Sequence, residues 1–122
     1  MRVEALVSGE SDVVGPETTL GDAAEVLISR SVGALAVVDG RRLVGIVTDR
    51  DLVRALAEGA DIEEPVSEWM TDGPDTVSPD VSVSEAADWL LETGYRHLPV
   101  ALGDELLGIV DIRDVLWTLR KG

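Results

Sequence analysis

Two seven-residue segments end in polar side chains that could bind a ligand. The first, GIVTDRD at residues 45–51, places a hydroxyl at Thr48 and a carboxylate at Asp51. A carboxylate can accept hydrogen bonds from both hydroxyls of a ribose, and a threonine hydroxyl can donate to a phosphate oxygen. The same spacing also forms a capping box at a helix start, which needs no ligand. The segment alone leaves both interpretations open.

The second segment, GIVDIRD at residues 108–114, keeps an arginine and a final acid but has Asp111 in place of the threonine. Aspartate is a good N-cap, so we expect a helix to start here too. A carboxylate repels a phosphate, so this segment is expected to hold phosphate poorly. The alternatives are an empty site, a less charged ligand such as adenosine, or a bridging metal ion.

Both segments belong to a repeat that covers nearly the whole chain. Pairing residues 3–59 with 66–122 gives 18 identities in 57 pairs without a gap. One copy is too short to bury both faces of a small sheet alone. The sequence therefore predicts two repeats, at 1–60 and 61–122, that form one compact module.

Each copy predicts the element order β-α-β-β-α after a short helical segment. Thr19 and Ser82 have N-cap spacing, with an acid three residues later. Two strands around a Gly-Asp turn follow, and the last helix ends at Gly59 or Gly122. The apolar face of the first helix in each copy is predicted to contain Leu20, Ala23, Ala24, Leu27 and Ile28, or Val83, Ala86, Ala87, Leu90 and Leu91.

Composition excludes several classes of protein. Ten Lys and Arg against 24 Asp and Glu give a net charge of −14, which argues against nucleic acid and anionic membranes as partners. The chain has no Cys and one His, so disulfide scaffolds and Cys chemistry are excluded and a metal site is not expected. No signal-peptide pattern or membrane span is visible, and we expect a cytoplasmic protein.

These features together resemble a tandem CBS domain pair, also called a Bateman module. The residues that carry the resemblance are the two segments above, the YRHLPV strand and the VSEWMTDGPDTVSPD lead-in, and it covers essentially the whole chain. It implies an α/β (α+β) fold in which two β-α-β-β-α repeats pack sheet to sheet with pseudo-two-fold symmetry. It also implies a stand-alone regulatory module, without catalytic residues.

The resemblance implies that AMP, ADP or ATP binds in the cleft between the repeats, with S-adenosylmethionine as an alternative. Mg²⁺ would enter only with a bound nucleotide. The module would signal to an unidentified protein target by changing conformation or oligomeric state, and homodimers through the helices are expected. Trp89 and Trp117 are interpreted either as core or as part of that homodimer contact.

Site residues carry over from the family position by position. Asp51 is expected to bind the ribose, Thr48 a phosphate or ribose oxygen, and Arg50 to help neutralise phosphate. In the second copy, the equivalents of Thr48, Arg50 and Asp51 are Asp111, Arg113 and Asp114, respectively.

The strand that starts near YRHLPV is expected to supply further contacts. Arg96 and His97 would reach the phosphates of a nucleotide whose ribose Asp51 holds, and the first copy has Gly33 and Ala34 at this place. The adenine would lie between apolar side chains, although residues of this kind more often form plain core: Val14, Val32 and Ala34 in the first copy, and Val77, Tyr95 and Leu98 in the second.

Two other functions remain as alternatives. A ligand-free interaction or scaffold module with degenerate sites is supported by Asp111. An enzyme has little support, because no Walker-type GxxxxGK[ST] segment is present and one His without Cys leaves few nucleophilic arrangements.

Overall fold

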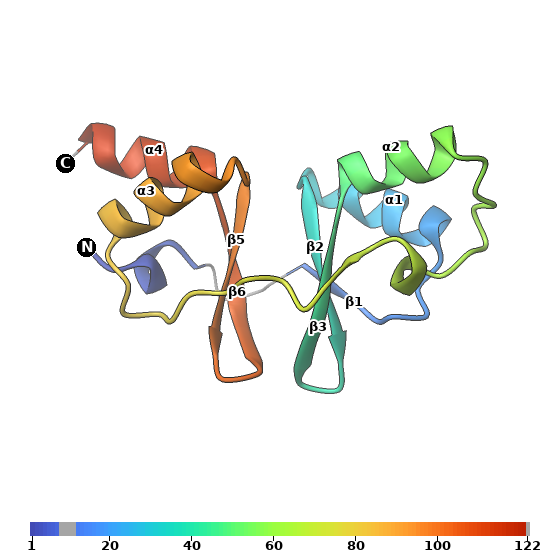
Figure 1. The fold of residues 1–122 in the computed structure, drawn as a ribbon, viewed down its shortest axis with the longest axis horizontal. Helices are drawn as coiled ribbons and strands as arrows, with labels where there is room; N and C mark the ends of the chain where they lie inside the picture. The colour runs from blue at the N-terminus through green and yellow to red at the C-terminus, as the bar shows by residue number, and fades with distance from the viewer. Residues whose placement is uncertain (8–11, 122) are drawn as a thin grey trace. The chain divides into compact units, whose positions relative to one another are not determined.

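The computed structural model describes residues 1–7 and 12–121, which divide into two compact units. The middle unit comprises Asp12–Pro74, and the terminal unit comprises residues 1–7 with 75–121. Figure 1 labels their α-helices and most of their strands. The C-cap predicted at Gly122 lies outside the described residues.

The middle unit is a small mixed sheet with two α-helices. Strand β1 pairs parallel with β2, β2 pairs antiparallel with β3, and β4 pairs antiparallel with β3. Helix α1 contacts β2, and α2 contacts both β3 and α1 (Figure 1). The elements are β1 (Val13–Val14), α1 (Leu20–Arg30), β2 (Ala34–Asp39), β3 (Arg42–Thr48), α2 (Asp49–Ala57), the 3₁₀ helix η2 (Val66–Glu68) and β4 (Thr71–Asp72).

The terminal unit repeats this arrangement. Strands β5 and β6 form an antiparallel hairpin, and a parallel bridge between Val77 and Val100 stands where β1 pairs with β2 in the middle unit. Its elements are the 3₁₀ helix η1 (Val3–Leu6), α3 (Val83–Thr93), β5 (His97–Leu102), β6 (Glu105–Asp111) and α4 (Ile112–Lys121). The α/β fold predicted from the sequence, with two β-α-β-β-α repeats, a mixed sheet and four α-helices, is confirmed.

Both predicted hairpins form with two-residue turns. Asp39 pairs with Arg42, and Leu102 pairs with Glu105. The first turn residue adopts a positive φ in each case, 65° at Gly40 and 59° at Gly103. Glycine meets this requirement without strain, which is why a Gly beside an Asp signals a tight hairpin.

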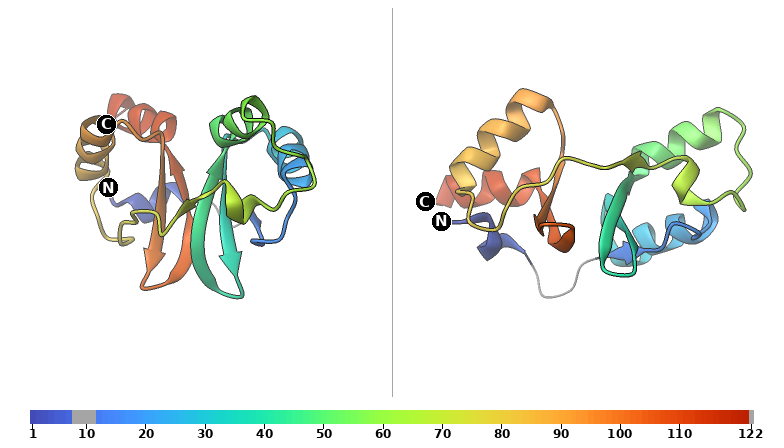
Figure 2. Two further views of the ribbon diagram at one scale, coloured as in Figure 1. Left: turned by 45° about the vertical axis from the view of Figure 1, so that its right-hand side comes forward. Right: turned by 60° about the horizontal axis from the view of Figure 1, so that its bottom comes forward.

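The short lead-in helices pack on the other repeat's elements. Val3 is fully buried in the core of the terminal unit, and its N–H donates to the Val81 carbonyl at 2.8 Å. Val66 is fully buried in the middle unit, where its N–H donates to the Thr18 carbonyl at 2.8 Å. Figure 2 shows η1, in dark blue, beside orange and red elements, and η2, in yellow-green, beside blue and green ones. The compact units therefore do not coincide with the sequence repeats.

The first helix of each copy begins as predicted but buries a narrower face. Thr19 Oγ1 accepts the Asp22 N–H at 3.1 Å, and Ser82 Oγ accepts the Glu85 N–H at 3.0 Å. The prediction that Ile28 and Leu91 share the buried face is wrong, because they are 80% and 69% exposed. Each follows a buried leucine by one residue, about 100° around the helix, which turns it away from the strands.

Candidate functional site

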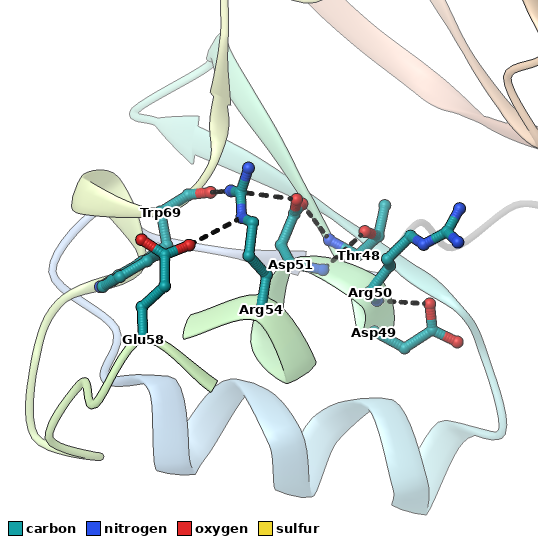
Figure 3. A network of polar contacts seen from close by, with 7 residues as sticks. All are labelled: Thr48, Asp49, Arg50, Asp51, Arg54, Glu58 and Trp69. Atoms are coloured by element: carbon teal, nitrogen blue, oxygen red, sulfur yellow. Dashed lines mark hydrogen bonds and ion pairs between the residues drawn. The ribbon is translucent and has the colours of Figure 1, made fainter. Parts of the chain in front are cut away.

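Thr48 and Asp51 form a reciprocal cap at the start of α2. Thr48 Oγ1 accepts the Asp51 N–H at 3.2 Å, and Asp51 Oδ2 accepts the Thr48 N–H at 2.9 Å (Figure 3). The structural interpretation of this spacing is therefore confirmed. The cap uses the threonine oxygen as an acceptor, which leaves the hydroxyl hydrogen available to donate, and carboxylate oxygens can accept more than one hydrogen bond.

The other carboxylate oxygen of Asp51 faces an arginine one turn along the helix. Arg54 Nη2 lies 3.5 Å from Asp51 Oδ1, and the Asp51 side chain is 17% exposed (Figure 3). Arg54 Nη2 also donates to the Trp69 carbonyl at 3.2 Å. Asp51 is thus held at both oxygens yet still reaches the surface.

The loop before β2 lies directly beside this helix start. The Asp49 N–H donates to the Gly33 carbonyl at 3.0 Å, and Ala34 is the register partner of Thr48. The structure therefore brings Gly33, Ala34 and Thr48 together, as the expected first site requires. Arg50 is exposed in the same turn, and its N–H donates to Asp49 Oδ1 at 2.7 Å.

The side chains expected to line an adenine in the first copy differ in exposure. Val14 and Val32 are half-buried and pack against the core of the middle unit. Ala34 is buried, so its contribution to a ligand would come through its backbone.

The equivalent helix start in the second copy has different contacts. Asp111 caps α4, because its Oδ1 accepts the Arg113 N–H at 2.7 Å, so the predicted capping role of Asp111 is confirmed. Arg113 Nε lies 3.4 Å from the same oxygen, and His97 Nε2 lies 3.4 Å from Asp111 Oδ2. The Ile112 N–H donates to the Arg96 carbonyl, which repeats the contact between Asp49 and Gly33.

A histidine and an arginine thus accompany the acid that replaces Thr48. His97 and Asp111 are register partners across the β5–β6 hairpin. The sequence predicted that His97 reaches the phosphates of a nucleotide at Asp51, and in the structure it contacts Asp111 in its own unit. Arg96 and Asp114 are exposed at the same end of the unit. Their part in ligand binding stays a prediction.

The other residues assigned to the second copy lie on and beside the core. Leu98 is fully buried and Val77 packs partly buried against the same cluster. Tyr95 is half exposed, with its ring centroid 5.5 Å from that of Trp89. Trp89 packs partly buried on the core, whereas Trp117 on α4 is 59% exposed.

Sequence reasoning missed Arg54 and Trp69 as neighbours of Asp51. Arg54 follows Asp51 by three residues, a spacing that places two side chains on one helix face, so this signal was available. Trp69 lies on a distant segment, and no local pattern places its carbonyl there.

The described residues hold no group of three or more His, Asp or Glu side chains arranged for a metal ion. Likewise, no helix within them is long and apolar enough to cross a membrane.

Known proteins share both the sequence pattern and the fold. The sequence matches the CBS domain family over residues 3–58 and again over 66–121. It is 39% identical over 116 residues to an uncharacterised 17.7 kDa protein of Acidianus ambivalens, covering 93% of this chain and 70% of that protein.

Two solved structures extend the comparison to ligands. The CBS domain protein PAE2072 from Pyrobaculum aerophilum, complexed with AMP, is 26% identical with a TM-score of 0.88 and all of both chains covered. The CBS domain pair of protein MJ0100, in complex with 5-methylthioadenosine and S-adenosyl-L-methionine, is 25% identical with a TM-score of 0.90, covering 99% of this chain and 97% of that chain. Two family matches, one per repeat, establish that the chain belongs to the CBS domain family and carries a tandem pair of CBS domains.

Proposed function

We propose that this protein is a regulatory sensor that binds an adenosine-containing ligand at the start of α2 and signals through its conformation or oligomeric state. The observation that carries the proposal is the pairing of Thr48 and Asp51. It presents a hydroxyl and a partly exposed carboxylate at the N-terminus of a helix, where backbone N–H groups favour an anion. Relatives complexed with AMP or S-adenosylmethionine support this choice of ligand class.

AMP, ADP and ATP are the preferred candidates, because Arg50 and the hydroxyl of Thr48 suit a phosphate. Arg50 is exposed beside Thr48, and its guanidinium supplies a charge opposite to that of a phosphate. S-adenosylmethionine, which carries no phosphate, is the alternative ligand. The protein is expected to act without catalysing a reaction and to work in the cytoplasm, where these ligands occur.

The test is calorimetric titration of AMP, ADP, ATP and S-adenosylmethionine against the protein and against Asp51→Asn. Asparagine retains an oxygen for the cap, so the fold is expected to survive. Loss of the charged acceptor is expected to weaken binding by about 10- to 100-fold. Asp49→Asn is the matched control, since Asp49 is exposed in the same turn. Absence of binding by every ligand, or equal binding by Asp51→Asn, contradicts the proposal.

A second candidate function is assembly of two copies of this chain into a homodimer, with or without a bound ligand. Apolar side chains are exposed at matched positions of α2 and α4, namely Val53 with Leu116 and Leu56 with Leu119. Trp117 adds a large exposed ring on α4. We propose that these helix faces form a homodimer contact, since buried aromatic anchors dominate many interfaces.

Sedimentation of a Trp117→Ser/Leu119→Ser protein tests this contact. We expect the mutant to sediment as a lighter species than the unaltered protein at the same concentration. Ile62→Ser is the control, because Ile62 is similarly exposed but lies between α2 and η2. An unchanged oligomer in the double mutant removes the homodimer proposal.

A further inference from the structure

Arg54 joins Asp51 to the segment through which the chain leaves the middle unit. Its guanidinium contacts Asp51 Oδ1 at 3.5 Å and the Trp69 carbonyl at 3.2 Å, and its Nε lies 4.0 Å from Glu58 Oε2 (Figure 3). An arginine side chain has five donors in a rigid fork, so one guanidinium can hold a carboxylate and a carbonyl at the same time.

Trp69 is also held at its other end. Its indole Nε1 donates to Glu64 Oε1 at 3.3 Å, and Glu64 Oε2 accepts the Asp61 N–H at 2.6 Å. The indole packs partly buried against the core of the middle unit. A change in the position of the Trp69 backbone would therefore alter the surroundings of this indole.

The residues after Trp69 continue along β3. The side chain of Met70 contacts the place where Gly45 would carry a Cβ, and Thr71 is the register partner of Ile46. The middle unit ends at Pro74. Arg54 therefore links the predicted ribose acid to the backbone at Trp69, five residues before the middle unit ends at Pro74.

We propose that Arg54 is a positioning residue that transmits ligand binding at Asp51 to the segment 69–74, an inference that rests on the proposed function. In the structure, Asp51 Oδ1 faces Arg54. A ribose hydroxyl that donates to the same oxygen competes with the guanidinium, which is then left with the Trp69 carbonyl and Glu58. The ligand therefore favours an arrangement in which Arg54 no longer contacts Asp51 over one in which it does. A ligand must bind two conformations with different affinity in order to shift their populations.

Within residues 1–7 and 12–121, only the first repeat contains this connection. The residue equivalent to Arg54 is Trp117, whose ring faces Lys121 Nζ at 5.1 Å and which cannot bridge a carboxylate to a carbonyl. The transmitted signal is therefore expected from ligand at Asp51 and not from ligand at Asp114.

The experiment reads Trp69 emission in a Trp89→Phe/Trp117→Phe background, in which Trp69 is the single tryptophan of the chain. AMP is titrated while its affinity is measured separately by calorimetry. We expect emission to change with the same midpoint as the heat of binding. In the same background, Arg54→Gln is expected to bind AMP within about fivefold of the parent, because an exposed ion pair contributes little. Its emission change should be at least about fourfold smaller than that of the parent.

Two further variants separate transmission from general damage. Glu58→Gln leaves both the Asp51 and Trp69 contacts of Arg54 available and is expected to keep the full emission change. Arg54→Lys keeps the charge but loses the fork, so its response is expected to be intermediate. Circular dichroism melting checks that each variant is folded.

The outcomes distinguish the two proposals. AMP binding with a static Trp69 emission, or with an equal emission change in Arg54→Gln, overturns the transmission and leaves the nucleotide proposal standing. Absence of binding by AMP, ADP, ATP and S-adenosylmethionine overturns both.

Discussion

The last helices of the two repeats begin at equivalent positions with different chemistry. At α2, Thr48 and Asp51 cap each other, whereas at α4 the Asp111 carboxylate accepts the Arg113 N–H and lies near His97. Both starts meet the same need, because the first N–H groups of a helix lack partners inside it. Capping therefore does not distinguish the repeats. What differs is the charge presented beside the helix start. Arg54 follows Asp51 at i+3, whereas Trp117 follows the equivalent Asp114.

Exchanging the two capping residues is the strongest test of this comparison. Thr48→Asp keeps an N-cap but replaces a donor with a negative charge, so AMP affinity is expected to fall about 10- to 100-fold. Asp111→Thr removes a negative charge and adds a hydroxyl, so calorimetry is expected to show a higher AMP stoichiometry.

Asp111→Asn is the control for the second exchange, because it removes the charge without adding a hydroxyl. Undiminished AMP affinity in Thr48→Asp would show that the hydroxyl has no part in phosphate binding.

Gly45 tests the contact between β3 and the segment through which the chain leaves the middle unit. A Cβ at Gly45 would meet the Met70 side chain and lie 3.0 Å from the Thr71 carbonyl oxygen. Gly45→Ala is expected to lower the free energy of unfolding by about 1–3 kcal/mol, as overpacking does. Urea denaturation measures this, and Gly15→Ala is the control because nothing lies within 4 Å of a Cβ there. Equal stability of the two mutants would contradict the packing argument.

Removing the caps compares their structural contributions directly. Thr48→Val and Asp111→Ala are each expected to lower the free energy of unfolding by about 1 kcal/mol, because each leaves a helix N–H without its side-chain acceptor. Thermal melts without ligand measure both, with the exposed Thr76→Val as control. A mutant as stable as that control would show that its cap contributes nothing.

The smallest expected effect concerns Asp80, because the first copy has no side-chain donor at the position equivalent to Ser78. Ser78 Oγ donates to Asp80 at 2.5 Å, which lowers the pKa of Asp80 below its ordinary value of 3.8. The equivalent position to Ser78 is Gly15, so the first copy lacks this bond. The carboxylate form is favoured in the folded state, so the stabilisation is present above pH 3.8 and is lost as the pH falls through the lowered pKa.

Ser78→Ala should therefore slightly lower the free energy of unfolding near neutral pH. It should also make that free energy depend less steeply on pH in the acidic range. Melting curves between pH 3 and pH 6 measure this. A slope of stability against pH identical to that of the unaltered protein would contradict the assignment to Asp80.

Much of the local structure could be predicted from short sequence patterns. The helix starts at Thr19, Ser82 and Thr48 follow from a capping residue with an acid three positions on, and the hairpins follow from Gly40 and Gly103. Ile28 and Leu91 were assigned to the wrong side, because an apolar residue at the edge of a helical stripe is buried only if a strand or helix reaches it.

Part of the candidate site could also be predicted from local sequence patterns. Thr48 and Asp51 are neighbours because a helix start brings residues three apart together. The contact of Arg54 with the Trp69 carbonyl spans 15 residues, and the nearness of His97 to Asp111 depends on the register of a hairpin. No local spacing predicts either contact.

The sequence by itself determined the repeat, the strands and helices, and the caps, because these depend on hydrogen bonds and side-chain preferences within a few residues. Only the tertiary structure decided that Val3 and Val66 complete the cores of units built from the other repeat's elements. It also decided that the segment after Val66 lies along β3, within reach of Arg54. Such contacts join distant parts of the chain, and their geometry is determined by how whole elements pack rather than by any single stretch of residues.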